Sequence, residues 1–153
     1  MPFSSKRTVS IWTVGALVAF TLAVFPGCGR SGPKTVSVSG KVTYKGKPVS
    51  KGNVVFQPVD IPKGRPFRPS RGEIREDGSY SLCTFDRDDG PMPGNYRVVI
   101  RSLISGPTPE NPTAPHNWAV PQRYTSAQTT PLEATIPEDA SGGMKFDFEL
   151  TDR

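Results

Sequence analysis

The sequence predicts an all-β protein, an antiparallel β-sandwich of about seven short strands. Short segments alternate apolar with polar residues and are bounded by clusters of turn-forming residues, which is the pattern of half-buried strands. After Cys28, no window of ten or more residues has the periodicity of an amphipathic helix. The 17 prolines and 15 glycines among the 153 residues also disfavour long helices.

Alternation begins in residues 36–44, where four apolar side chains fall on one face. A turn follows, and then a short segment that starts with β-branched residues at 54–57. The pair Asp77-Gly78 predicts a tight hairpin turn between two further strands. The segments predicted as strands are residues 36–44, 54–57, 73–75, 80–82, 96–101, 132–136 and 145–150.

The clearest alternation lies in residues 96–101 and 145–150. Only one face of each segment is apolar, which is typical of antiparallel sheets that pack one face on a core. The expected core side chains are Tyr96, Val98 and Ile100 in the first segment and Phe146, Phe148 and Leu150 in the second.

Several phrases of the sequence resemble those of carboxypeptidase regulatory-like domains. They are VSGKV at residues 38–42, GKPV at 46–49, DGSY at 77–80, PGNYRV at 93–98 and VPQRY at 120–124. The resemblance spans roughly residues 35–150 and implies a sandwich similar to transthyretin and to some carbohydrate-binding modules. It implies a non-catalytic domain, and because its motifs are turns and core positions, it indicates a fold better than a function.

The N-terminal segment has the parts of an export signal. Lys6 and Arg7 precede a run of apolar and small residues from Val9 to Phe25, and Pro26-Gly27 then disfavours a helix. The order of charge, apolar run, small residue and Cys28 resembles a bacterial lipoprotein signal. An uncleaved anchor helix and a conventional cleaved signal are the alternatives, although the run is short for a span and Phe25-Pro26-Gly27 is a poor conventional cleavage site.

The lipoprotein resemblance implies cleavage before Cys28 and acylation of that residue. Phe25 and Pro26 depart from the aliphatic and small residues usual at these positions. The expected organisation is a signal peptide over residues 1–27, a tether over 28–34 and one sandwich domain over 35–153. Acyl chains on Cys28 would hold the protein firmly at a membrane of the cell envelope, because each CH₂ group buried in the bilayer contributes about 0.8 kcal/mol to binding. Gly29, rather than an aspartate, favours the outer membrane by analogy.

Charge is distributed unevenly along the chain. Residues 28–71 hold ten basic side chains and one acid, Asp60, whereas residues 72–153 hold seven basic and thirteen acidic side chains. Such asymmetry suits either an anionic partner, for example acidic polysaccharide or phosphorylated lipid, or a solvated face whose lysines block edge pairing. Nucleic acid is not expected as a partner, since basic and aromatic residues are not interleaved.

The connection over residues 104–128 is the best candidate for binding, because long loops in compact domains are often functional. Aromatic, amide and guanidinium groups occur together there, and they suit stacking on sugars or capture of a peptide. Alternatively, Trp118 and Tyr124 pin the loop onto the sandwich. The candidate binding residues are His116, Asn117, Trp118, Arg123 and Tyr124.

An enzymatic function and a metal site are not expected. If Cys28 is acylated, Cys83 has no disulfide partner, and it is predicted to be a small buried side chain in a strand. His116 is the single histidine and lies far from Cys83 in the sequence, so no Cys–His catalytic pair is expected. The aspartates of residues 86–89 suggest calcium, but they fail the EF-hand spacing and are typical of a turn. No cofactor is expected.

Overall fold

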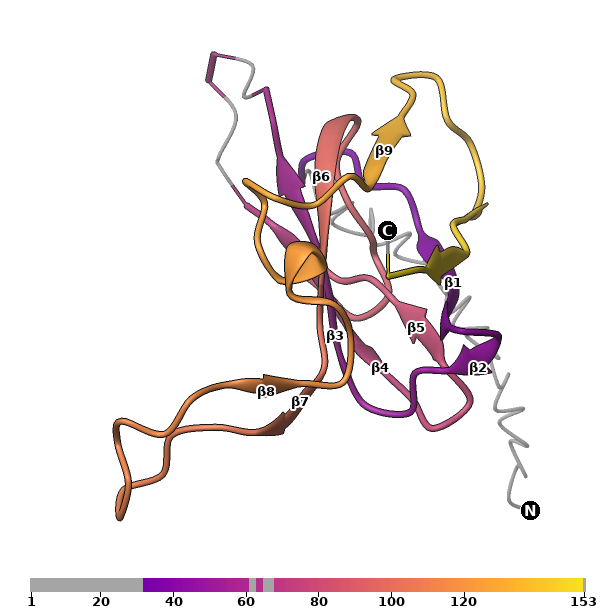
Figure 1. Ribbon diagram of the computed structural model, residues 1–153. Coiled ribbons are helices and arrows are strands. Elements are labelled where there is room, and N and C mark those ends of the chain that lie inside the picture. The colour runs from indigo at the N-terminus through magenta and orange to yellow at the C-terminus, as the bar shows by residue number, and fades with distance from the viewer. Residues whose placement is uncertain (1–31, 61–62, 65–67, 153) are drawn as a thin grey trace, which may run out of the picture. The chain divides into compact units, whose positions relative to one another are not determined.

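The computed structural model describes residues 32–60, 63–64 and 68–152. Within them the chain is nearly all β, with eleven strands and one short 3₁₀ helix, so the predicted all-β sandwich is confirmed (Figure 1). Cys28 and the predicted signal segment, residues 1–27, lie outside the described residues. Among the described residues, no helix is long and apolar enough to span a membrane.

One sheet has five strands and is organised around β1 (Val38–Tyr44), which pairs with all four others. The strands β2 and β5 are antiparallel to β1, whereas β10 and β11 are parallel to it. These parallel pairings differ from the antiparallel arrangement that the sequence predicts. The partners of β1 are β2 (Lys47–Pro48), β5 (Ser79–Ser81), β10 (Met144–Lys145) and β11 (Phe148–Leu150).

The second sheet has four strands in the order β4-β3-β6-β9, and every pairing in it is antiparallel. Its longest strand, β6, contains the strongly alternating segment that begins at Tyr96. Each of the predicted strands corresponds to an observed one, except that residues 145–150 divide into two. The strands of this sheet are β3 (Gly52–Pro58), β4 (Ser70–Ile74), β6 (Gly94–Arg101) and β9 (Glu133–Ile136).

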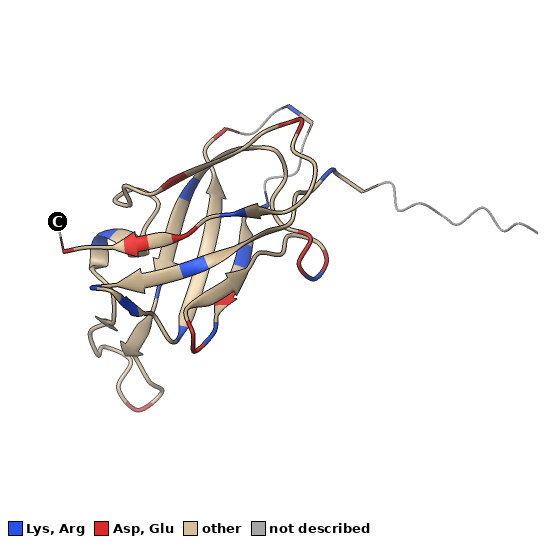
Figure 2. Cartoon of the chain, turned by 90° about the vertical axis from the view of Figure 1, so that its right-hand side faces the viewer, with Lys and Arg blue, Asp and Glu red and all other residues tan. Residues whose placement is uncertain are grey.

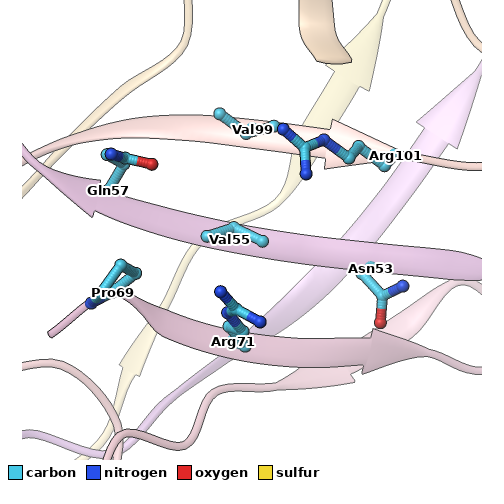
Figure 3. A pocket seen from close by; sticks show the side chains of 7 residues that line it. All are labelled: Asn53, Val55, Gln57, Pro69, Arg71, Val99 and Arg101. Carbon is cyan, nitrogen blue, oxygen red and sulfur yellow. The ribbon is translucent and has the colours of Figure 1, made fainter. Parts of the chain in front are cut away.

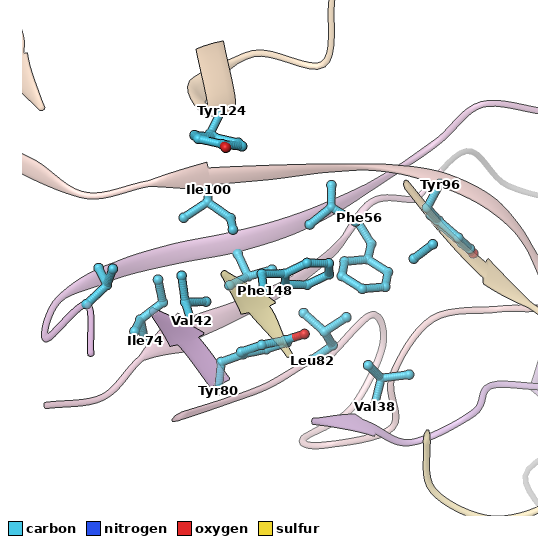
Figure 4. Packing of buried hydrophobic residues seen from close by; sticks show 14 of the residues in the cluster. Val38, Val42, Phe56, Ile74, Tyr80, Leu82, Tyr96, Ile100, Tyr124 and Phe148 are labelled. Atoms are coloured by element: carbon cyan, nitrogen blue, oxygen red, sulfur yellow. The ribbon is translucent and has the colours of Figure 1, made fainter. Parts of the chain in front are cut away.

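The core lies between the two sheets, and the period-two pattern determines its residues (Figure 4). Phe56 of β3 is at its centre, with its ring centroid 5.8 Å from that of Tyr96 and 6.2 Å from that of Phe148. All three side chains are buried. Burial of each such side chain contributes roughly 1.5–3 kcal/mol, so this cluster is a main source of stability.

The two parallel pairings of β1 are interrupted at Gly40, which lies against the backbone of Phe146. A Cβ atom at Gly40 would be 1.7 Å from the Phe146 carbonyl oxygen. That carbonyl accepts a hydrogen bond from the Tyr80 hydroxyl at 2.7 Å. The Asp147 carboxylate then accepts one from the Lys41 backbone N–H at 2.8 Å. Side chains therefore replace the backbone ladder here, and the close approach requires glycine at position 40.

Candidate binding surface on the β7–β8 arm

Two short strands form an arm that projects from the sandwich (Figure 1). The strands β7 (Leu103–Ser105) and β8 (Asn117–Trp118) pair only with each other among the described residues. At the base of the arm, the Ala119 N–H donates to the Ser102 carbonyl at 2.8 Å. The arm therefore continues directly from β6 and presents strand edges that have no partner in the described part of the chain.

The arm exposes a group of apolar and aromatic side chains. The rings of His116 and Trp118 stack in parallel, with centroids 5.4 Å apart and planes 8° apart. Leu103 is the register partner of Trp118, and it is 43% exposed. Ile104, next in the chain, is 64% exposed. Exposed aliphatic side chains beside a half-buried indole are typical of surfaces that bind another molecule.

A hollow of about 360 Å³ opens at the base of this arm. Ser102 and Ala119 line it on the arm side, and the β1–β2 turn lines it on the other. Lys45 in that turn makes an ion pair with Asp152 at 2.8 Å, and the hydrogen bond to Asp152 raises the pKa of Lys45. Pro48 and Val49 give the hollow an apolar lining, and Ser102 and Ala119 directly precede β7 and follow β8 in the chain.

The structure separates the five residues that the sequence groups as candidates. His116, Asn117 and Trp118 lie at the arm, while Arg123 and Tyr124 lie in the 3₁₀ helix η1 (Gln122–Thr125). Tyr124 is 3% exposed and belongs to the core cluster. Its ring is therefore not available as part of a stacking platform with Trp118.

Arg123 and Tyr124 attach η1 to the end of the last strand. The Tyr124 hydroxyl donates to the Thr151 carbonyl and accepts from the Thr151 N–H, each at 3.2 Å, and Arg123 Nη2 donates to it at 2.7 Å. Burial raises the pKa of Tyr124, but the hydrogen bonds from Thr151 and Arg123 outweigh it and lower that pKa below 10.0. The guanidinium carbon of Arg123 lies 4.7 Å from the Tyr124 ring centroid. Tyr124 therefore anchors the 104–128 connection to the sandwich. For Tyr124, this agrees with the alternative interpretation of that connection.

Cys83 does not lie where the sequence predicts it. Cys83 is exposed, with Sγ donating to the Arg71 carbonyl at 3.2 Å, so the prediction of a buried side chain is wrong. The reason is that Leu82 takes the core-facing position and the next residue must face outward.

The aspartates of residues 86–89 form a turn, as the sequence predicts. The Asp89 carboxylate accepts hydrogen bonds from three backbone N–H groups, those of Thr84, Phe85 and Asp86, at 2.7–3.1 Å. Within the described ranges, no three His, Cys, Asp or Glu side chains form a metal-binding group.

The sequence reasoning missed the outer face of the four-stranded sheet. A shallow hollow there is lined by the guanidinium groups of Arg71 and Arg101 (Figure 3). Figure 2 shows that basic and acidic residues are otherwise interspersed along the chain. The signal was present in the alternation, since residues that are out of phase with core positions face outward, but only pairing of the strands brings the two arginines to one face.

No family model and no curated protein sequence matches this chain. Among solved structures, the chain is similar to a 9R-lipoxygenase from Cyanothece PCC8801, with a TM-score of 0.41 and 12% sequence identity. The similarity covers 79% of this chain and 17% of the lipoxygenase chain. At that TM-score the similarity does not bear on function.

Proposed function

We propose that this chain is a lipid-anchored, non-catalytic protein of the cell envelope that binds a partner protein through the β7–β8 arm. The observation that carries the binding role is the exposure of Leu103 and Ile104 on the projecting strand β7, whose edge away from β8 has no partner in the described part of the chain. These are two of only four large apolar side chains that are exposed among the described residues. The anchor rests on Cys28 and the export-like segment before it.

A protein partner fits the arm better than a glycan. Stacking on a sugar needs an open aromatic face, and His116 covers one face of the Trp118 indole. The neighbouring exposed side chains are aliphatic. A short strand with free N–H and C=O groups is suited to pairing with an added strand of another protein, in which the backbone supplies affinity and alternate side chains supply specificity.

Glycan binding remains the alternative function, and it would use the outer face of the Trp118 and His116 stack. That alternative predicts that Trp118→Ala abolishes binding to a glycan array by the full chain. A Trp118→Ala protein that binds the array as well as wild type excludes it. Protein binding instead predicts that Ile104→Asp is the more damaging change, because a charge at the centre of an apolar contact is left desolvated and unpaired.

Site-specific photocross-linking in the native envelope tests the proposal. A photoreactive amino acid at position 104 should give a discrete protein adduct, and the same group at position 59 is the matched control. Val59 is an apolar side chain of similar exposure, 53%, outside the arm. The Leu103→Asp change should remove the adduct formed from position 104. Equal adducts from positions 104 and 59, or none from 104, would refute binding through the arm.

The anchor has a separate test. Metabolic labelling with an alkyne fatty acid should mark the wild-type chain and not Cys28→Ser. Cys83→Ser is the matched control and should be labelled as wild type. If the Cys28→Ser protein is processed and retained in the membrane like wild type, acylation at Cys28 is wrong, whatever the cross-linking result.

A further inference from the structure

The outer face of the four-stranded sheet brings together side chains from three strands. On β3, Asn53, Val55 and Gln57 alternate with core residues and therefore face outward. Val55 is the register partner of Arg71 on β4 and of Val99 on β6. Asn53 is the partner of Arg101, one row along. The two arginines are thus on opposite sides of β3, with Val55 between them (Figure 3).

These side chains line a hollow of about 240 Å³. Figure 3 shows the guanidinium groups of Arg71 and Arg101 flanking Val55, with the carboxamides of Asn53 and Gln57 at the two ends. The volume is below the roughly 300–1,000 Å³ of sites that enclose a drug-sized ligand. The hollow therefore suits one unit of an extended ligand that crosses the face.

The two arginines have hydrogen-bonding capacity to spare. Among the described residues, the Arg71 side chain makes no hydrogen bond or ion pair. Arg101 uses its Nε to donate to the Thr125 carbonyl at 2.9 Å, which holds the side chain along the face and leaves its terminal nitrogens available. A third arginine on the same face, Arg97, is already paired with Glu133 at 2.9 Å. Glu73 is the acidic residue nearest in register, and it makes no ion pair with Arg71 in the described part of the chain.

The chemistry of this face matches a carboxylate-bearing sugar. A guanidinium binds a carboxylate through two parallel hydrogen bonds. Asn and Gln carboxamides both donate and accept, as hydroxyl groups require. The half-buried Val55 side chain offers an apolar contact for the C–H groups of a sugar ring, whereas Val99 beside it is 2% exposed. From strand spacing, the Cα atoms of Arg71 and Arg101 are about 12 Å apart, on the two sides of the hollow.

We infer that this face binds an acidic polysaccharide that carries uronate carboxylates. A peptide cannot add to it as a strand, because both edges of β3 are paired. Binding to an anionic membrane surface usually requires a cluster of four to eight lysines or arginines, and this hollow has two available guanidinium groups. A membrane is therefore a poorer match than a polysaccharide. The inference does not depend on the arm, since no residue of the hollow belongs to β7 or β8.

Affinity electrophoresis of the full chain in gels that contain polygalacturonate, with dextran as the neutral polymer, tests the inference. Wild type should be retarded by polygalacturonate and not by dextran. Arg71→Ala and Arg101→Ala should each weaken the affinity about tenfold, the loss expected for one charge-assisted contact. Lysine at either position should recover only part of the affinity, because it keeps the charge but cannot form the two parallel hydrogen bonds of a guanidinium. Raising the salt concentration should weaken binding.

Arg75→Ala is the matched control. Arg75 is exposed, follows β4 directly, contacts the hydroxyls of Ser79 and Ser81, and does not line the hollow. This variant removes the same charge and should bind as wild type. Asn53→Ala is a second variant that leaves both arginines in place, and it should also weaken binding. Circular dichroism of each variant checks that it is folded.

Four results would overturn the inference. They are equal retardation in dextran, wild-type affinity in the Arg71→Ala/Arg101→Ala double variant, an equal loss in Arg75→Ala, and tighter binding to an acidic peptide or to anionic vesicles of matched charge. Loss of photocross-linking in an arm variant that still binds polygalacturonate separates this site from the proposed partner site.

Discussion

Replacing Gly40 with alanine tests the close approach of β1 to the segment between β10 and β11 within the five-stranded sheet. Local propensity favours the change, since glycine within a strand costs about 0.5–1 kcal/mol relative to alanine. The tertiary structure predicts the opposite sign. The new Cβ would be 1.7 Å from the Phe146 carbonyl oxygen and 2.6 Å from its carbon, and both atoms are backbone. No side-chain rotation relieves this overlap, so the segment between β10 and β11 must move away from β1.

The magnitude follows from what that movement disrupts. Overpacking of a filled interior costs typically 1–3 kcal/mol. The Tyr80 hydroxyl would lose its bond to the Phe146 carbonyl, and the Lys41 N–H its bond to Asp147, at about 0.5–1.5 kcal/mol each. Gly40→Ala should therefore reduce the free energy of unfolding by roughly 2–6 kcal/mol.

Urea denaturation of the full chain, followed by far-ultraviolet circular dichroism, measures this change. Gly143→Ala is the matched control, because a Cβ there meets only the Ser37 carbonyl oxygen at 3.9 Å, an ordinary contact. The control should stay within about 1 kcal/mol of wild type. A Gly40→Ala protein as stable as wild type, or more stable, would refute the close approach of Phe146 to β1.

Three further predictions concern single side chains. Tyr124→Phe should lower the free energy of unfolding by about 1–3 kcal/mol in urea denaturation, because Arg123 and the Thr151 backbone groups lose the Tyr124 hydroxyl as their hydrogen-bond partner. His116→Ala is the control and should have little effect on this free energy. The hydrogen bond from Lys145, and next that from the Lys41 N–H, lower the pKa of Asp147, so its contribution to stability is present above its unfolded value of 3.8 and lost as pH falls through the lower folded value. Thermal unfolding between pH 5 and pH 2 should therefore depend less on pH in Asp147→Asn, and an unchanged pH dependence contradicts this. A maleimide should modify Cys83 in the native protein, as located by peptide mass spectrometry, and protection until unfolding would contradict its exposure.

Alternation predicted most, but not all, of the core: Phe146 is only partly buried, and Val120 and Tyr124 are core residues outside any alternating segment. In β1, β3 and β11 the buried apolar residues belong to one phase, because successive side chains of a strand point to opposite faces. In β6, Val99 of the opposite phase is buried as well. The same alternation explains why Cys83 is exposed: it follows buried Leu82, so its side chain points to the opposite face. Its burial was predicted from the type of residue rather than from its phase in the strand.

The candidate site was less predictable. The five residues of the 104–128 connection are close in sequence, yet a turn of the chain at Val120 takes Tyr124 into the core while Trp118 stays on the arm. The 3₁₀ helix spans four residues and has no periodic pattern by which to recognise it. The pairing of Tyr124 with Thr151 joins positions 27 residues apart, which local patterns do not encode.

The sequence by itself determined the all-β class, the core-facing phase of most strands and the position of the long connection, because these depend on local alternation and turn chemistry. Only the tertiary structure decided the parallel pairing of β1 with β10 and β11, the need for glycine at position 40, and the meeting of Arg71 with Arg101 on one face. Each of these depends on strand register, which is fixed when the whole sheet packs its apolar face on the core.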